Sequence, residues 1–157
     1  SFDHAMSKLN QSGMREVLDE LVLETKIPVL GICVGMQIML RKSEEGVENG
    51  LGWIQSDVIK FDSDFNGSEN KTPHMGWNSI NPKIDSPLLK NLNSHSEFYF
   101  LHSYYCDIKN SENILASSNY QKEFTSILKF NNIYGIQCHP EKSHSSGINL
   151  LTNFSNI

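Results

Sequence analysis

The feature that most constrains the fold is a cysteine between two glycines, where a short apolar run gives way to a helical pattern. Residues 28–32 are typical of a buried strand, and apolar residues recur at helical spacing over 34–42. Cys33 lies at the junction, with Gly31 and Gly35 on either side. This G-x-C-x-G pattern is the thiol form of the nucleophile elbow, a strand-to-helix turn so sharp that both flanking positions favour glycine. It predicts a nucleophilic thiol with a pKa lowered by the helix dipole; a buried structural cysteine is the alternative.

Composition limits the possible settings for such a thiol. The 157 residues suit one domain, spanning 1–157, with a real core, and 38% of them are hydrophobic. The net charge of −5, without a basic stripe, argues against nucleic acid as a partner. The apolar runs are far too short to span a membrane. Three cysteines without zinc spacing predict a reducing cytoplasm, and neither a metal nor an organic cofactor is implied.

Hydrophobic periodicity gives the order of the elements. Helices are expected first and strands later in the chain, which favours an α/β fold with antiparallel hairpins in the C-terminal half. The expected helices are 3–9, 12–24 with Ser12 as its N-cap, 34–42, a short one from Ser86, and 147–154. The expected strands are 28–32, 51–61, 77–80, 98–108, 114–117, 125–130 and 133–137. Asn131 and Asn132 mark a hairpin between the last two strands.

A second group of chemically active residues follows the last predicted strand. His139 precedes Pro140 and Glu141, so one short turn can supply a general base and the acid that orients it. The alternative is an ordinary surface pair of histidine and glutamate. Cys33 is 106 positions away, yet both residues are expected at strand ends, where functional residues of α/β sheets gather.

The two motifs together, G-I-C-V-G-M-Q at 31–37 and Q-C-H-P-E-K-S at 137–143, resemble those of class I glutamine amidotransferases. Within that family, P-H-M-G-W-N at 73–78 and H-S-Y-Y at 102–105 resemble HisH, the glutaminase subunit of imidazole glycerol phosphate synthase. The resemblance covers essentially the whole chain. It implies a flavodoxin-like mixed sheet flanked by helices, and hydrolysis of L-glutamine to glutamate and ammonia without a cofactor.

The resemblance also implies roles for individual residues. Cys33 matches the nucleophile that forms a γ-glutamyl thioester, His139 the base, and Glu141 the acid that orients it. Four further residues match positions that contact the substrate or its oxyanion: Val34, Gln37, Ser103 and Tyr104.

Three residues match positions that face a partner subunit in the family, namely Trp77, Tyr99 and Lys142. The implied partner is a HisF-like cyclase subunit that receives the ammonia within a heterodimer. The simpler interpretations are core packing for Trp77 and Tyr99 and a solvated charge for Lys142.

The chain departs from the family pattern in two places. Cys138 stands where an aromatic residue is common, and an inert buried thiol is expected there. The first residues match the family just after a Pro-Gly-x-Gly loop that supplies a second oxyanion donor. The expectation is therefore an N-terminally truncated chain that lacks the leading strands of the sheet and is weakly active or inactive as written.

Other functions remain open at this point. A HisH-like paralogue could instead donate ammonia to a sugar amidotransferase of surface-polysaccharide synthesis, which Gly52-Trp53 and residues 142–144 resemble somewhat more. A cysteine peptidase or γ-glutamyl hydrolase shares the elbow and the histidine but would not be expected to carry residues 73–78 and 102–105. An inactive regulatory module would not require Cys33, His139 and Glu141 to be intact.

Overall fold

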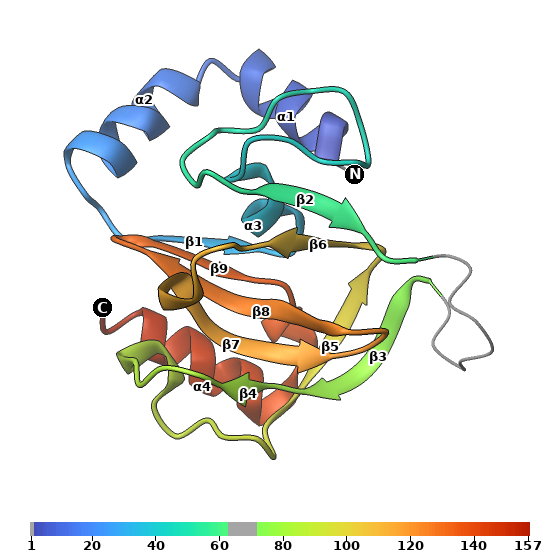
Figure 1. Cartoon of the computed structure of the whole chain (residues 1–157). Coiled ribbons are helices and arrows are strands. Elements are labelled where there is room, and N and C mark those ends of the chain that lie inside the picture. The colour runs from blue at the N-terminus through green and yellow to red at the C-terminus, as the bar shows by residue number, and fades with distance from the viewer. Residues whose placement is uncertain (1, 63–71) are drawn as a thin grey trace.

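The centre of the molecule is a five-stranded mixed sheet, seen in a computed structural model that describes residues 2–62 and 72–157 (Figure 1). The strand order is β1 (Val29–Ile32), β9 (Ile133–Ile136), β8 (Glu123–Phe130), β7 (Ile114–Asn119) and β4 (Asn81–Pro82). β1 and β9 are parallel, and the remaining pairs are antiparallel. The expected α/β fold with C-terminal hairpins is confirmed.

Two smaller antiparallel sheets accompany the central one. β2 (Asp57–Lys60) pairs with β6 (Tyr104–Asp107), and β3 (His74–Ser79) pairs with β5 (Glu97–His102). The single strand expected over 98–108 is therefore wrong. The chain leaves one sheet and enters another at Ser103, whose carbonyl accepts a hydrogen bond from Phe61 N at 3.0 Å. This break places Ser103 at a bend between β5 and β6.

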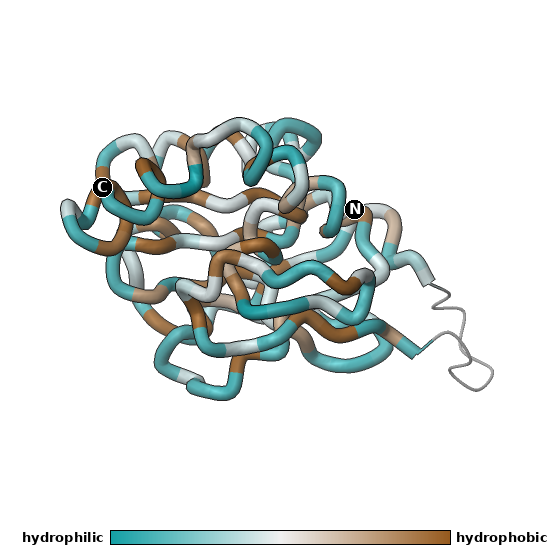
Figure 2. The backbone as a smooth tube through the Cα atoms, turned by 90° about the horizontal axis from the view of Figure 1, so that it is seen from above, coloured by the Kyte–Doolittle hydropathy of each residue, from teal (hydrophilic) through white to brown (hydrophobic). Residues whose placement is uncertain are grey.

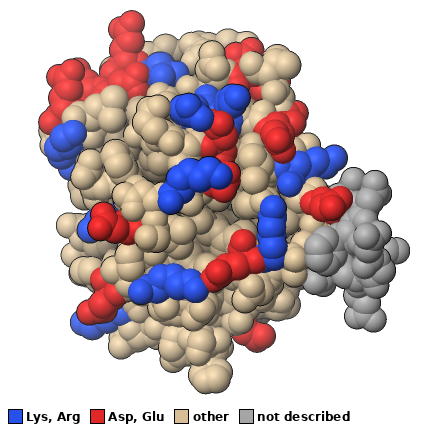
Figure 3. Space-filling view, viewed as in Figure 1, with Lys and Arg blue, Asp and Glu red and all other residues tan. Residues whose placement is uncertain are grey.

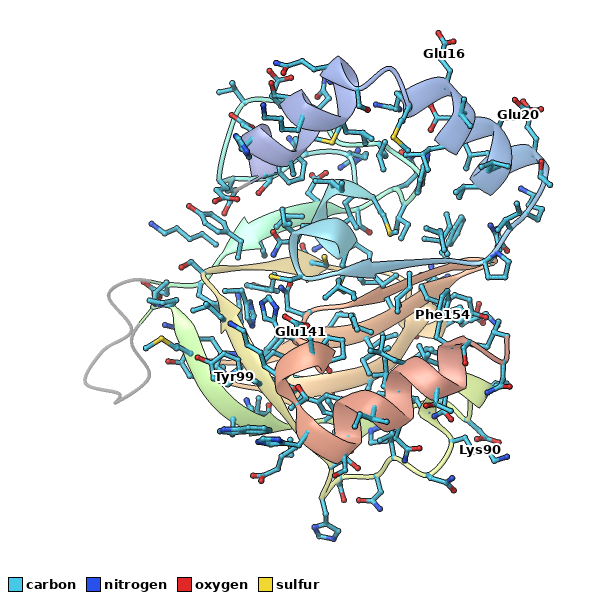
Figure 4. The ribbon with its side chains drawn as sticks, turned by 180° about the vertical axis from the view of Figure 1, so that it is seen from behind. Glu16, Glu20, Lys90, Tyr99, Glu141 and Phe154 are labelled. Atoms are coloured by element: carbon cyan, nitrogen blue, oxygen red, sulfur yellow. The ribbon has the colours of Figure 1, made fainter. Side chains whose placement is uncertain are left out.

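The helices lie on both sides of the central sheet (Figures 1 and 4). α1 (Phe2–Gln11), α2 (Arg15–Asp19) and α3 (Val34–Ile38) lie on one side, while α4 (His144–Phe154) lies on the other. The single-turn helical segments are η1 (Glu20–Glu24), η2 (Pro87–Leu89), η3 (Ser111–Asn113) and η4 (Pro140–Lys142). No helix among the described residues has the length and apolarity to span a membrane.

Three boundaries differ from the sequence prediction because backbone groups make hydrogen bonds other than those expected. α3 ends at Ile38 because its following carbonyls bind a loop: Gly52 N donates to Leu40 O at 3.1 Å and Ile54 N to Met39 O at 3.1 Å. That loop also occupies most of the strand expected over 51–61, leaving only β2. Ser12 does not cap the second helix; its hydroxyl donates to Leu9 O at 2.6 Å and accepts from Met14 N at 3.2 Å.

The sheet is buried on both faces, so apolar side chains project from it in both directions. On β9, Ile133 packs into a core beneath α1 and α3, while Tyr134 and Ile136 pack into a second core on the α4 side. Figure 2 shows hydrophobic segments in the interior and hydrophilic segments along the outer loops. Two packed layers thus hold β1 and β9, the strands that precede Cys33 and His139, in fixed register.

Candidate active site

Cys33 sits on the sharp turn between β1 and α3 in a strained backbone conformation with positive φ, at φ 52° and ψ −110°. Its N–H donates to Ile136 O on β9 at 2.8 Å. Its carbonyl accepts from Met36 N at 3.1 Å and Gln37 N at 3.2 Å, which begins α3. A non-glycine residue at positive φ is costly and is held in place by its surroundings. The predicted nucleophile elbow is therefore present, with its geometry imposed by the neighbouring strand.

The two glycines of the motif differ in what the fold requires of them. A Cβ on Gly31 would lie 2.6 Å from the backbone of Gly35 and Met36, so only glycine lets α3 approach β1 this closely. A Cβ on Gly35 would meet nothing within 4 Å among the described residues. The expectation that crowding demands glycine at both positions is wrong for Gly35.

His139 is fixed by its backbone and by its ring. Its N–H donates to Tyr99 O at 2.8 Å, and its Nδ1 lies 2.8 Å from Glu141 Oε1. Ser143 reinforces the turn, because its hydroxyl donates to His139 O at 2.5 Å and accepts from Tyr99 N at 3.0 Å. The carboxylate accepts the Nδ1 proton and leaves Nε2 as the basic nitrogen.

The topology brings Cys33 and His139 to the same edge of the sheet, as the strand-end argument predicts. They follow the adjacent parallel strands β1 and β9, in which Ile32 pairs with Ile136. Within the described part of the chain, no hydrogen bond joins the sulfur to the imidazole. The sulfur instead lies 3.9 Å from Leu101 O and 3.6 Å from Gln137 Nε2. The two residues therefore share one edge of the sheet, while the sulfur has Leu101 and Gln137 as its hydrogen-bond partners.

The thiol of Cys33 has a raised pKa, contrary to the prediction from the helix dipole. Burial is the main cause, and the negative charge of Glu141 acts in the same direction. Hydrogen bonds from Val34 N–H and the Gln137 amide oppose it without reversing it. A thiol that rests protonated requires a base to become a nucleophile, and His139, at the same edge of the sheet, is the candidate.

A cavity of about 320 Å³ opens beside the sulfur. Every substrate-contact residue expected from the sequence lines it, together with Glu45 from the loop after α3. These residues are Cys33, Val34, Gln37, Ser103, Tyr104 and Glu45. A cavity of about 390 Å³ near β6, β7 and β8 holds no histidine, and its thiol, Cys106, is buried with a raised pKa.

Glu45 is a site residue that the sequence analysis did not single out. One of its carboxylate oxygens, Oε2, accepts a hydrogen bond from Phe2 N at 2.7 Å. The S-E-E-G run at 43–46 is the only signal for it in the sequence. A carboxylate in the cavity wall suits a ligand that carries an ammonium group.

The Gln37 amide is committed within the protein. Its Nε2 donates to Tyr104 O at 3.0 Å and to Gln137 Oε1 at 3.1 Å. A ligand in the cavity can therefore use only the Gln37 oxygen. Gln137, fully buried, was also missed, because an amide two residues before a histidine carries no sequence signal of its own.

Two buried histidines support the cavity wall from behind. His102 Nδ1 lies 2.8 Å from Tyr104 O, and its Nε2 lies 3.0 Å from His74 Nδ1. His74 Nε2 in turn lies 3.2 Å from Asn78 Nδ2. Because a carbonyl only accepts, His102 carries its proton on Nδ1. Asn78 Nδ2 also donates to Asn119 O, so this nitrogen donates to His74 Nε2 as well. His74 therefore donates from Nδ1 to His102 Nε2, and both rings are then neutral. Burial lowers the pKa of His74 to about 4 and that of His102 to about 3.

The expected partner residues gather on the outer face of the two-stranded β3–β5 sheet. Trp77, 47% exposed, makes an edge-on contact with Tyr99 at 6.1 Å between centroids, and Lys142 Nζ lies 5.5 Å from the Tyr99 ring. His144 stacks on Trp77 at 5.1 Å. Figure 4 shows Tyr99 and Glu141 close to the start of α4. The exposure excludes the simple core interpretation for Trp77.

Two further exposed apolar residues extend this face. Met75 and Leu101 are cross-strand partners, as are Trp77 and Tyr99. All four side chains lie on one face of the β3–β5 sheet, because side chains alternate between the two faces along each strand. We call these four residues the β3–β5 face. On the side of the molecule in Figure 3, by contrast, basic and acidic side chains are interspersed.

Comparison with known proteins bears on this geometry. The family model "Glutamine amidotransferase class-I" matches residues 8–156. The chain is 51% identical to imidazole glycerol phosphate synthase subunit HisH of Bdellovibrio bacteriovorus, over 100% of this chain and 77% of that protein. It is 47% identical to the same subunit of Leptospira borgpetersenii, with the same coverage. A solved glutamine amidotransferase of Thermotoga maritima superposes with a TM-score of 0.59 at 16% identity, covering 93% of this chain and 54% of that one.

Proposed function

The chain belongs to the class I glutamine amidotransferase family, and we propose that it is the glutaminase subunit of an imidazole glycerol phosphate synthase of histidine biosynthesis. It hydrolyses L-glutamine to glutamate and ammonia. The observation that carries this proposal is the elbow thiol of Cys33, which lines a cavity together with the residues expected to hold the substrate, while the hydrogen-bonded pair of His139 and Glu141 follows the adjacent strand at the same edge of the sheet.

The first half of the reaction forms a thioester. His139 Nε2 takes the proton of the Cys33 thiol, and the sulfur attacks the side-chain carbonyl carbon of glutamine. The Val34 N–H, at the start of α3, stabilises the oxyanion that develops. When the carbon–nitrogen bond breaks, His139 gives its proton to the leaving ammonia. Glu141 stabilises the imidazolium through Nδ1, which matters because the buried thiol rests in its protonated form.

The second half repeats the same proton transfers with water. His139 removes a proton from the water as its oxygen attacks the thioester carbon, and the carbon–sulfur bond breaks to release glutamate. The thiolate regains the proton from His139. Ser103 and Tyr104 hold the amino-acid end of the substrate, and the Glu45 carboxylate balances the charge of its ammonium group.

We place the ammonia acceptor against the β3–β5 face. Its strands adjoin the active site directly, since Tyr99 O binds the backbone of His139 and Leu101 O approaches the Cys33 sulfur. A HisF-like cyclase subunit seated there would form a heterodimer and receive ammonia before bulk water could protonate it. The three cysteines are all free thiols, which suits a reducing cytoplasm.

Glutamate release from L-glutamine, measured alone and with a HisF-like cyclase subunit, tests the proposal. The full-length protein should form glutamate in the presence of the cyclase, and the same protein with Cys33→Ala should form none above background. Co-purification with the cyclase and synthesis of imidazole glycerol phosphate from glutamine would support the pathway. Binding to a sugar amidotransferase instead of the cyclase would reassign the partner while leaving the glutaminase chemistry in place.

A further inference from the structure

Gln137 contacts both the nucleophile Cys33 and the cavity residue Gln37, and it has no assigned role. It follows β9 directly, and its backbone N–H donates to Ser126 O on β8 at 2.8 Å. Its side chain is fully buried, with Nε2 3.6 Å from Cys33 Sγ and Oε1 3.1 Å from Gln37 Nε2. A buried amide group thus lies within hydrogen-bond distance of the nucleophilic sulfur.

The hydrogen-bond network fixes which end of this amide faces the sulfur. Tyr104 O can only accept, so the atom of Gln37 that lies 3.0 Å from it must be the nitrogen. That nitrogen also faces Gln137, whose oxygen must therefore point toward it. A flipped Gln137 would set two NH₂ groups against each other and turn its carbonyl toward the sulfur. The amide N–H of Gln137 is consequently the group directed at Sγ.

The surroundings of the sulfur then divide between its two protonation states. Leu101 O, at 3.9 Å, can accept only from the thiol and favours the protonated form. The Gln137 N–H can donate to the thiolate and favours the ionised form. Because burial removes water from the sulfur, a donor held in place by the fold is worth more there than in solvent.

We propose that Gln137 is a further catalytic residue, whose amide N–H donates a hydrogen bond to the Cys33 thiolate. In this step the S–H bond breaks, the proton goes to His139 Nε2, and the electron pair stays on sulfur beside the Gln137 donor. Gln37 has a positioning role, because its nitrogen holds the Gln137 oxygen. The proposal rests on the glutaminase function and adds to it the group that stabilises the nucleophile.

Two substitutions separate this role from simple packing. Gln137→Met keeps the volume and removes the donor. Gln137→Glu keeps the shape, still accepts from Gln37, and sets a carboxylate oxygen against the sulfur. Ser126→Ala is the matched control: its side chain is equally buried on the adjacent strand, and its hydroxyl has no hydrogen-bond partner among the described residues.

The rate of Cys33 alkylation by iodoacetamide, measured against pH, reports the thiolate directly. Cys106 and Cys138 are buried and should not react, and Cys33→Ser is the control that tests this. For Gln137→Met we expect the thiol pKa to rise by about one unit, which slows alkylation at pH 7 roughly tenfold. Gln137→Glu should slow it further at any pH at which its carboxyl group is ionised. For both variants kcat should fall while KM for glutamine stays within about twofold, because the donor acts on sulfur rather than on bound substrate.

The outcomes distinguish the two proposals. Folded Gln137→Met with a wild-type alkylation profile would refute the role of Gln137, as would an equal shift in Ser126→Ala. If Gln137→Met fails to fold, Gln137→Leu, which also has no donor, decides. A shifted profile together with a full-length protein that releases no glutamate in the presence of the cyclase would keep the thiolate role and overturn the glutaminase function.

Discussion

The buried pair of His74 and His102 predicts a specific loss of stability in mild acid. The chain from Asn78 through both rings to Tyr104 O is satisfied only when each imidazole is neutral. A proton added to His102 Nε2 would face the N–H of His74. One added to His74 Nε2 would face the Asn78 amide, whose nitrogen also donates to Asn119 O at 2.8 Å. The folded protein therefore resists protonation at both positions.

The magnitude follows from the two pKa values. Burial is the main cause that lowers them from 6.5 to about 4 for His74 and to about 3 for His102. As pH falls below 6.5, the unfolded chain binds protons that the folded chain refuses, so stability is present above pH 6.5 and declines below it. Between pH 7 and pH 5 each histidine costs about 2 kcal/mol, or about 4 kcal/mol together, before the folded state begins to titrate.

Urea unfolding at both pH values measures this loss. The control is a double variant, His74→Gln with His102→Gln, which keeps hydrogen-bonding groups but cannot titrate. It should be less stable than the wild type at pH 7, yet lose about 4 kcal/mol less between pH 7 and pH 5. Equal losses in the two proteins would refute the reasoning. Should the variant not fold, NMR titration of the wild type decides, and a midpoint above pH 6 for either ring would be fatal to the argument.

Three other predictions concern the elbow, the cavity and the β3–β5 face. Gly31→Ala should cost about 1–3 kcal/mol of stability and most of the glutaminase activity, because its Cβ meets backbone at 2.6 Å, whereas Gly35→Ala should unfold at the wild-type temperature or above. Glu45→Gln should raise KM for glutamine roughly tenfold to a hundredfold with kcat nearly unchanged, since a hydrogen bond to a charged group contributes about 1.5–3 kcal/mol; an unchanged KM would remove Glu45 from the site. Trp77→Ala should weaken cyclase binding by about 2 kcal/mol in calorimetry with little effect on folding, while Val17→Ala, equally exposed on α2, should leave binding unaltered.

The sequence predicted correctly those strands and turns whose conformation depends on residues close together in the chain. The apolar run of β1 and the hairpin at Asn131, which adopts φ 55°, both appear where they were expected. The break at Ser103 could not be predicted, because residues on both sides alternate as strands do and nothing in them specifies their partners. The early end of α3 is similar in origin, since the donors that stop it come from residues 50–54.

The site divides along the same line. Motif spacing located Cys33 and the pair of His139 and Glu141, because the residues of each motif act within a few positions of one another. The direction of the Cys33 pKa was wrong, since a five-residue helix offers less than burial takes away. Gln137 and Glu45 escaped notice because their value lies in contacts made across the fold, to Cys33 and into the cavity.

The alternation of residues after β9 explains both the substituted position and the proposed donor. The backbone stays extended here, since His139 bridges to Tyr99. Side chains at 137 and 139 therefore project toward the Cys33 edge, and the one between them projects the opposite way. Cys138 accordingly packs fully buried in the core on the α4 side, where burial raises its pKa; the expectation that this thiol is inert stays a prediction. The side chain at position 138 contributes only to core packing, so cysteine can replace an aromatic residue there. The amide of Gln137 faces the Cys33 sulfur, so its replacement should change the chemistry.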